Sequence, residues 1–159
     1  MRVTSLGRNT RLTRILGFAV KGQHCFVTAL FYCDHLGIIG VPVRFLIDTG
    51  NVHTALTEAT AKRLRIDLTK LYSEEHKIKV SGIGGSAEGY QLANVRFVFK
   101  DEDGAPVEEK LQFVYILKFP TPRNDEERKA LGLIPDLLGL DIIRRFSFRF
   151  EKNLVYLER

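Results

Sequence analysis

The segment Phe45-Leu-Ile-Asp48-Thr49-Gly50-Asn51 places a carboxylate where an apolar stretch of the chain ends. Residues 41–47 are rich in β-branched and aromatic side chains, and this composition predicts a buried strand. A carboxylate at the end of such a strand is costly unless it is hydrogen-bonded or protonated. The hydroxyl and the glycine that follow it are also what an ordinary Asx turn needs. Asp48 therefore either ends a strand for structural reasons or is a carboxylate held in place for chemistry.

A second segment, residues 79–90, is rich in glycine. Its spacing Gly82-x-Gly84-x-x-Ala87 matches the dinucleotide-binding fingerprint. That fingerprint requires a helix directly after the glycines, with its N-terminus facing a phosphate, whereas residues 95–99 alternate in polarity like a strand. We therefore expect a long hairpin with a glycine-rich tip, which has few side chains to pack. It is either a plain surface hairpin or a mobile cover over a site, and a nucleotide-binding module is the weaker alternative.

A third segment, Leu137-Leu138-Gly139, precedes a predicted short helix. Two apolar residues followed by glycine are typical of a place where two backbone segments cross closely, because glycine has no side chain to keep them apart. On its own this segment indicates only core structure.

Much of the rest of the chain alternates between apolar and polar residues with a period of two, which is the pattern of strands that bury one face. Gly, Asn and Asp residues separate these runs and predict turns. The predicted strands are 25–33, 41–47, 95–99, 111–117, 146–150 and 154–157, and the predicted short helices are 58–64, 126–131 and 138–146. The sequence therefore predicts a mainly β fold, a barrel or sandwich with a few short helices.

The composition is that of one ordinary globular domain, with 159 residues of which 45% are hydrophobic and 27% are charged. The net charge of +5 arises in residues 1–33, which hold five of the 24 basic residues and none of the 19 acidic ones. Such an arm is weak support for nucleic-acid binding, which needs basic residues clustered on the fold. No apolar run approaches the roughly 18 residues of a membrane-spanning helix. We therefore predict neither a nucleic-acid partner nor a membrane partner.

The arginine-rich, acid-free start of the chain is also similar to a mitochondrial transit peptide, whereas its apolar run at 15–20 is too short for a secretory signal. We expect residues 1–20 to be a basic arm or strand that stays on the protein. The predicted location is cytoplasmic, with organelle targeting as the alternative.

The two cysteines, Cys25 and Cys33, lie in one predicted strand. At 3.3 Å per residue they are roughly 26 Å apart, which is too far for a disulfide. The same extension separates His24 from His35, so the sequence predicts no metal site and no cofactor. We expect free thiols in a reducing compartment.

In their order and spacing the three segments resemble the retropepsin-like aspartic peptidases, single-domain relatives of pepsin. The resemblance runs from about residue 21 to residue 159 and implies the retropepsin-like acid-protease β-barrel. It implies that Asp48 is the catalytic aspartate, that the Thr49 hydroxyl braces two active-site turns across a dimer, and that Gly50 is the turn glycine. It also implies that Ile83, Gly84 and Gly85 form the tip of a flap over the substrate.

The chain departs from this family at two places. Asn51 stands where Ala or Ser is usual, and it is larger and able to hydrogen-bond near the carboxylate. Leu140 stands where retroviral members carry Arg after the Leu-Leu-Gly glycine, so the salt bridge associated with that Arg at the dimer contact is missing.

The chemistry of amide hydrolysis explains why one such chain is not enough. Without a metal or a covalent intermediate, one carboxylate must activate water and one carboxylic acid must polarise the carbonyl. The chain has a single Asp-Thr-Gly, so we expect a homodimer that acts on a peptide or protein substrate. The rival hypothesis is a catalytically silent domain of the same fold that only dimerises or binds peptide. No Ser lies in a Gly-x-Ser-x-Gly elbow, and His53 is expected to be a structural histidine.

Overall fold

The computed structural model describes residues 11–20, 24–73, 77–82 and 85–159. Its strands are β1 (Arg14–Val20), β2 (His24–Cys33), β3 (Ile38–Ile47), β4 (Ala55–Thr57), β5 (Lys77–Gly82), β6 (Gly85–Lys100), β7 (Pro106–Lys118), β8 (Asp136–Leu138), β9 (Ser147–Glu151) and β10 (Leu154–Glu158). Its helices are α1 (Glu58–Arg63), α2 (Leu68–Tyr72), α3 (Asp125–Gly132) and α4 (Leu140–Ile143), and η1 (Asp34–Leu36) is a 3₁₀ turn. The prediction of a mainly β fold with short helices is confirmed.

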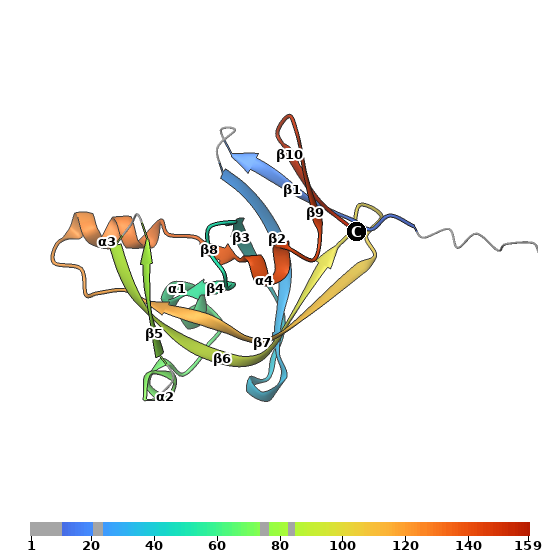
Figure 1. Cartoon of the computed structure of the whole chain (residues 1–159). Helices are drawn as coiled ribbons and strands as arrows, with labels where there is room; N and C mark the ends of the chain where they lie inside the picture. The colour runs from blue at the N-terminus through green and yellow to red at the C-terminus, as the bar shows by residue number, and fades with distance from the viewer. Residues whose placement is uncertain (1–10, 21–23, 74–76, 83–84) are drawn as a thin grey trace, which may run out of the picture.

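The strands form one sheet in the order β5-β6-β7-β4-β8-β3-β2-β1-β10-β9. Strand β2 also pairs with β6, so the sheet folds back on itself (Figure 1). The space inside is filled largely by phenylalanine. The Phe97 ring lies 5.5 Å from Phe31 and 5.4 Å from Phe45, and all three side chains are fully buried. This packing anchors β3, the strand that leads to Asp48.

Both predicted hairpins are present. Strands β2 and β3 pair antiparallel around η1, and Gly37 ends that turn in the left-handed conformation with φ of 67°. Strands β6 and β7 pair antiparallel as well, but each is longer than its alternating core predicted. The extra length of β6 reaches back to Gly85, so the glycine-rich segment belongs to this sheet.

Two of the three predicted helices, 58–64 and 126–131, are confirmed as α1 and α3, and each begins with a side-chain cap. The Thr57 side chain accepts the N–H of Thr60 at the start of α1. The Asn124 side chain accepts the N–H of Glu127 at the start of α3. Both are N-cap hydrogen bonds of the usual kind.

The predicted helix 138–146 is wrong in its extent. Residues 136–138 form β8, which pairs parallel with β3 and antiparallel with β4. Only residues 140–143 are helical. An apolar pair such as Leu137-Leu138 suits a buried strand as well as a helix, and two neighbouring strands supply hydrogen-bond partners that favour the strand.

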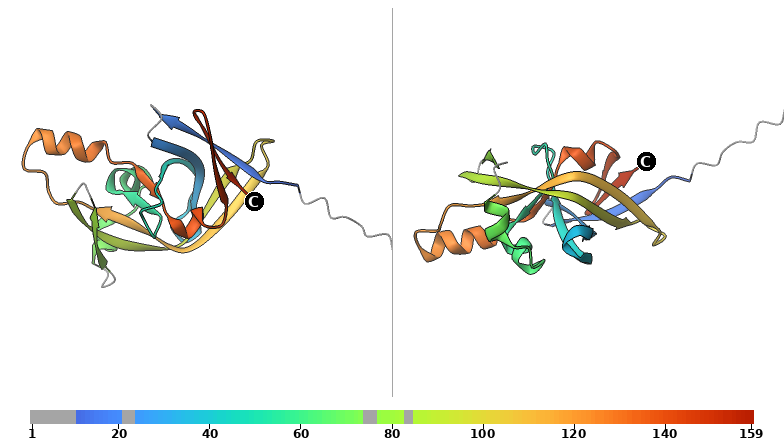
Figure 2. Two further views of the ribbon diagram at one scale, coloured as in Figure 1. Left: turned by 45° about the horizontal axis from the view of Figure 1, so that its top comes forward. Right: turned by 90° about the horizontal axis from the view of Figure 1, so that it is seen from below.

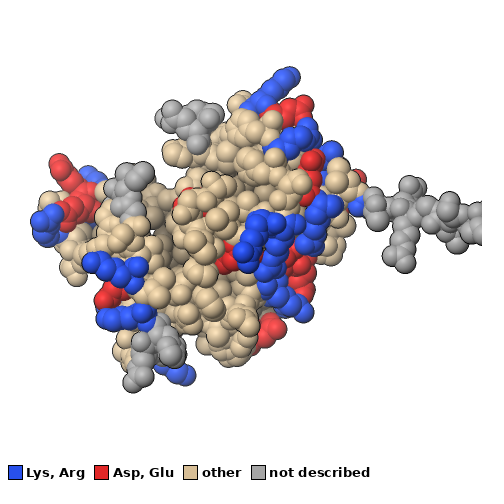
Figure 3. Space-filling model, viewed as in Figure 1, with Lys and Arg blue, Asp and Glu red and all other residues tan. Residues whose placement is uncertain are grey.

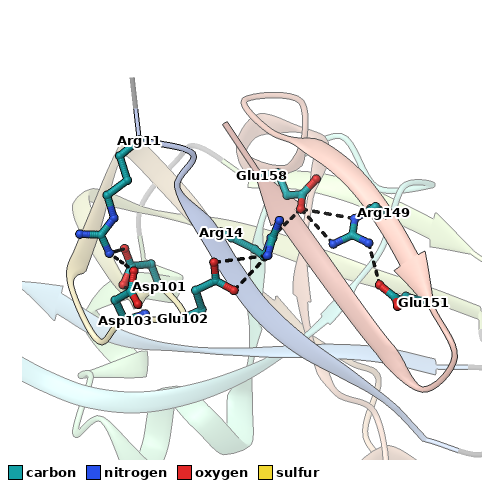
Figure 4. A network of polar contacts seen from close by, with 8 residues as sticks. All are labelled: Arg11, Arg14, Asp101, Glu102, Asp103, Arg149, Glu151 and Glu158. Atoms are coloured by element: carbon teal, nitrogen blue, oxygen red, sulfur yellow. Dashed lines mark hydrogen bonds and ion pairs between the residues drawn. The ribbon is translucent and has the colours of Figure 1, made fainter. Parts of the chain in front are cut away.

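The first and last described residues lie together at one end of the molecule, and α3 lies at the other (Figure 2). Thr13 and Arg159 exchange two backbone hydrogen bonds of 2.8 and 3.0 Å. Beside them, Arg14 bridges Glu102 and Glu158 (Figure 4). Among the described residues, no helix has the length and apolar character needed to cross a membrane.

Candidate active site

Asp48 directly follows β3, where the chain turns sharply. Its N–H donates to the carbonyl oxygen of Leu138 at 3.0 Å, which continues the parallel pairing of β3 with β8. Its carboxylate oxygen Oδ1 accepts the N–H of Gly50 at 2.9 Å. A Cβ at Gly50 would lie 3.2 Å from that same oxygen, so a larger residue would crowd the carboxylate. The segment is thus an Asx turn, and the turn holds the carboxylate in one place.

The turn is fastened on its far side by the start of α4. The N–H groups of Leu140 and Asp141 donate to the carbonyl oxygens of Asn51 and Val52 at 2.9 and 3.1 Å. Gly139 makes this approach possible, because a Cβ there would lie 2.4 Å from the carbonyl carbon of His53. The expected close crossing of backbone at Gly139 is therefore present, and it supports the turn that carries Asp48.

Two further residues of this support were not singled out in the sequence, Thr54 and Asp141. The Asp141 carboxylate accepts the Thr54 N–H at 2.9 Å and the Thr54 hydroxyl at 2.7 Å. The same hydroxyl accepts the N–H of Gly139 at 3.1 Å, and Thr54 is fully buried. In the sequence, the only sign of this role is that Asp141 lies in the first turn of a short helix. Acidic residues at that position are common in helices of any function.

A hollow of about 470 Å³ opens beside the Asp48 carboxylate. The turn lines one side, the β5–β6 hairpin lines the other, and four apolar residues lie between them. The full lining is Asp48, Gly50 and Asn51 of the turn, Val80, Ser81, Gly85 and Ala87 of the hairpin, and Leu117, Phe119, Ile134 and Leu137. Asp48 is the one ionisable residue in this lining. The part of the surface over β3 and β8 carries few charges in Figure 3. The arrangement therefore presents a single fixed carboxylate to an apolar groove.

Among the described residues, those of the aspartate turn and those of the glycine-rich hairpin line the same hollow. Gly85 lies at the hairpin, opposite Gly82 in the β5–β6 register, and has φ of +112°. The other two predicted flap residues, Ile83 and Gly84, lie outside the described residues. Strand β6 begins at Gly85, so a strand rather than a helix follows the glycines and the dinucleotide alternative lacks the element it requires.

The turn residues Thr49 and Asn51 differ in exposure. Thr49 is exposed and Asn51 is half-buried. Both described side chains are close in sequence to Asp48, but no hydrogen bond joins either of them to its carboxylate within the described part of the chain.

A larger hollow of about 600 Å³ adjoins the first and shares Ala87 and Phe119 with it. Its one carboxylate, Glu88, is ion-paired with Lys77 at 3.0 Å. The hydrogen bond from Lys77 lowers the pKa of Glu88. A carboxylate held ionised by its own lysine is a poor acid or base, so the smaller hollow is the better candidate site.

A second carboxylate lies behind the turn but does not reach the hollow. Asp136 is buried and accepts hydrogen bonds from the Thr57 N–H at 2.7 Å, the Thr57 hydroxyl at 3.1 Å and the Thr60 hydroxyl at 2.7 Å. Burial raises its pKa, against the opposite effect of these hydrogen bonds. Asp136 ties β8 to the start of α1, so its role is structural.

The remaining candidates from the sequence carry no site in the structure. His53 packs its ring against Phe113 and Tyr115 at 5.5 and 5.3 Å, as a structural histidine would. Cys25 and Cys33 are free thiols, and burial raises the pKa of both. Within the described ranges, no three His, Cys, Asp or Glu side chains are grouped to hold a metal ion.

A folded-back sheet with a glycine-rich hairpin over an Asp-Thr-Gly turn, supported by a Leu-Leu-Gly segment, defines the retropepsin-like class of proteins. The family model described as aspartyl protease matches residues 35–133, and the chain belongs to this family.

Comparison with solved structures gives the same fold. A retropepsin-like aspartic protease from Rickettsia conorii is similar over 99% of this chain and 97% of its own, with 22% identity and a TM-score of 0.54. EIAV protease in complex with the inhibitor HBY-793 matches 77% of this chain and 88% of its own, with 17% identity and a TM-score of 0.40. Among curated proteins, none matches this sequence.

Proposed function

We propose that this chain is an aspartic endopeptidase that hydrolyses peptide bonds, with Asp48 as its catalytic residue. The observation that carries the proposal is the position of the Asp48 carboxylate. It is held by the Gly50 N–H at 2.9 Å and is the one ionisable group in the lining of an apolar hollow beside the β5–β6 hairpin. A hollow of about 470 Å³ is in the range of small-ligand sites, and its apolar lining suits the side chains of a peptide.

The chemistry requires a second carboxylate beside the first. One carboxylate takes a proton from water while the water attacks the carbonyl carbon, and one carboxylic acid donates a hydrogen bond to the carbonyl oxygen. Two such groups in contact cannot both ionise, so they share one proton. This chain contributes one Asp-Thr-Gly turn, and we propose that a second copy contributes the other Asp48 around a two-fold axis.

The neighbouring residues receive roles in the same proposal. The exposed Thr49 hydroxyl is free to brace the two turns against each other across the dimer. Gly50 leaves room for the carboxylate, and the Asn51 N–H closes the turn by donating to the Asp48 carbonyl oxygen at 3.3 Å. The hairpin that carries Ile83, Gly84 and Gly85 serves as the flap over the bound peptide, and the substrate is a peptide or protein.

The experiment that tests the assignment is Asp48→Asn. The amide can still accept the Gly50 N–H, so the turn is retained, but it can act neither as base nor as acid. We expect peptide cleavage to fall by roughly a thousandfold or more, with the fold and the oligomeric state unchanged. Asp67→Asn is a control, because Asp67 is an exposed N-cap residue of α2 whose carboxylate also accepts a backbone N–H, that of Lys70 at 3.1 Å, and it lies outside the hollow.

Two results would contradict the proposal. The first is an Asp48→Asn variant that cleaves at nearly the wild-type rate. The second is a wild-type protein that neither cleaves a broad peptide library nor binds a pepstatin-like inhibitor of aspartic proteases. The second result would favour the catalytically silent domain.

A further inference from the structure

Helix α3 stands away from the body of the molecule. It lies at the end that carries the β5–β6 hairpin (Figure 1), and none of its eight residues is buried. Most of the stability of a helix in a folded protein comes from packing an apolar face against a neighbouring element. In α3, Ala130 is exposed and Leu131 is only half-buried. The apolar part of this helix is therefore open to contact with another molecule.

A hollow of about 420 Å³ separates α3 from the hairpin. The helix lines it with Glu127, Ala130 and Leu131. These residues are spaced three and four positions from Glu127, so they share one face of the helix. The hairpin contributes residues 85–86, and the segment 119–123 that follows β7 completes the lining. The apolar residues of α3 thus point to the side of the molecule where the hairpin lies.

The charged groups of this hollow are paired with each other. The Arg123 guanidinium donates to the Glu127 carboxylate at 2.7 and 3.0 Å, and the Arg123 N–H donates to the same carboxylate at 2.7 Å. These hydrogen bonds lower the pKa of Glu127, so the two charges persist and cancel. The rest of the lining is mainly apolar and includes Pro120, Pro122 and Leu131. The hollow therefore suits an uncharged, apolar group.

This hollow adjoins the one that holds Asp48, because Gly85 and Phe119 line both of them. Phe119 is half-buried and packs against the apolar cluster that contains Ala87 and Leu117, which also line the Asp48 hollow. It is therefore fixed where the two hollows meet. A peptide bound in an extended conformation advances about 3.3 Å per residue, so its side chains away from the cleaved bond extend into an adjoining hollow.

We propose that α3 forms the outer wall of a substrate subsite, which takes an apolar side chain of the peptide away from the cleaved bond. This inference rests on the proposed function, because the occupant is the peptide held at Asp48. The apolar face of α3 then packs against the substrate instead of against the protein's own core. Leu131 is the residue of α3 that determines this specificity.

The first test compares Leu131→Ala with Leu133→Ala as the matched control. Leu133 is the same residue type two positions further on, is 82% exposed and lies outside the hollow. No residue of α3 is buried, so the fold should survive both substitutions. The substrates are pairs of peptides that carry either Leu or Ala at one position outside the two residues that flank the cleaved bond. Cleavage of each pair gives kcat and KM.

We expect Leu131→Ala to lower kcat/KM by about fivefold or more for the Leu peptide at the position that occupies this hollow. The loss should lie mainly in KM, because the contact is made in the bound substrate as well as in the transition state. The Ala peptide should be cleaved equally well by both proteins, and Leu133→Ala should behave like the wild type on both peptides. Identical profiles for Leu131→Ala and Leu133→Ala would overturn the proposal.

Peptide binding to the Asp48→Asn protein makes a second test that does not depend on cleavage. The same peptide pairs are titrated by fluorescence anisotropy, and the ratio of the two dissociation constants is measured with and without the substitution at Leu131. We expect Leu131→Ala to reduce the preference for the Leu peptide by about fivefold, and Leu133→Ala to leave it unchanged. A preference that Leu131→Ala does not alter contradicts the subsite.

The failure of this proposal is distinguishable from the failure of the proposed function. If Asp48→Asn abolishes cleavage but Leu131→Ala changes neither the cleavage profile nor the binding preference, the enzyme assignment stands and α3 does not contact the substrate. If Leu131→Ala changes the binding preference but the wild type cleaves no peptide, the subsite stands and the catalytic assignment fails.

Discussion

Thr54 and Asp141 are 87 residues apart in the chain, yet together they hold the loop that follows the Asp48 turn. The N–H and the hydroxyl of Thr54 both donate hydrogen bonds to the Asp141 carboxylate, and the Thr54 hydroxyl oxygen accepts the N–H of Gly139. All of these groups lie in or beside the core, where an unpaired polar group is costly. The rigidity of the turn that carries Asp48 is therefore expected to depend on the buried hydroxyl of Thr54.

This expectation is tested by the pair Thr54→Val and Thr54→Ser. Valine keeps the shape but leaves the Gly139 N–H and one Asp141 oxygen without a partner, so we expect the free energy of unfolding to fall by about 1–3 kcal/mol. Serine keeps the hydroxyl and should lose clearly less. Urea unfolding measures both variants, and equal losses would mean that the hydroxyl does not hold the loop.

Asp136 gives a prediction for the dependence of stability on pH. Burial raises its pKa from the ordinary value of 3.8, although the hydrogen bonds from Thr57 and Thr60 act in the opposite direction. A carboxyl whose pKa is higher in the folded state stabilises that state when it is protonated, and this contribution disappears as the pH rises through the raised pKa. We therefore expect the unfolding free energy of the wild type, relative to Asp136→Asn, to decrease as the pH rises above 3.8. Urea unfolding at a series of pH values measures this difference, and a difference that grows with pH contradicts the assignment.

Only part of the site could be predicted from single residues. Asp48 and Gly50 are conspicuous because they interrupt an apolar run, and that signal is local. Asp141 and Asp136 look like ordinary acids at a helix start and after a proline. Their partners, Thr54, Thr57 and Thr60, lie in or beside β4 and α1 and reach them through the pairing of β4 with β8. A single sequence contains no signal for that pairing.

At the scale of the elements, a glycine of the β5–β6 hairpin can be compared with a glycine of the β6–β7 turn. Gly85 has φ of +112° beside the hollow, and Gly104 has φ of +81° near the β6–β7 turn. A Cβ at either position would meet nothing within 4 Å. Alanine at either position therefore costs only backbone strain, about 1 kcal/mol or more.

We expect Gly85→Ala to reduce peptide turnover severalfold, because a strained backbone at the hairpin tip hinders the opening and closing of a flap. Gly104→Ala should lose a similar amount of stability and keep its turnover. Steady-state cleavage and thermal unfolding of both variants make the comparison. Equal turnover in the two variants would remove the flap role from the hairpin.

The elements that the sequence predicted well are those defined by neighbours in the chain. The hairpins of β2 with β3 and β6 with β7 follow from alternation around a turn, and α1 and α3 follow from their caps. The short strands β4 and β8 were not predicted, since each has three residues and is strand only because distant strands lie on both of its sides. The helix predicted for 138–146 was too long for the same reason.

At the scale of the whole molecule, the chain belongs to the aspartyl protease family and carries one Asp-Thr-Gly turn. Its core packs behind β3, and its hollow opens beside a carboxylate that has no second carboxylate among the lining residues. In a symmetric dimer each copy contributes the same residues, so one carboxylate from each chain would form a pair. The central claim is therefore that activity belongs to the pair of chains.

The most direct test mixes wild-type chains with Asp48→Asn chains in equal amounts and lets the subunits exchange. If both Asp48 carboxylates are needed, only dimers of two wild-type chains cleave, and random pairing leaves about a quarter of the activity of the same total amount of wild type. If each chain works alone, about half of the activity remains. We predict the quarter, with a quadratic dependence on the wild-type fraction across the titration. A linear dependence would contradict the shared site.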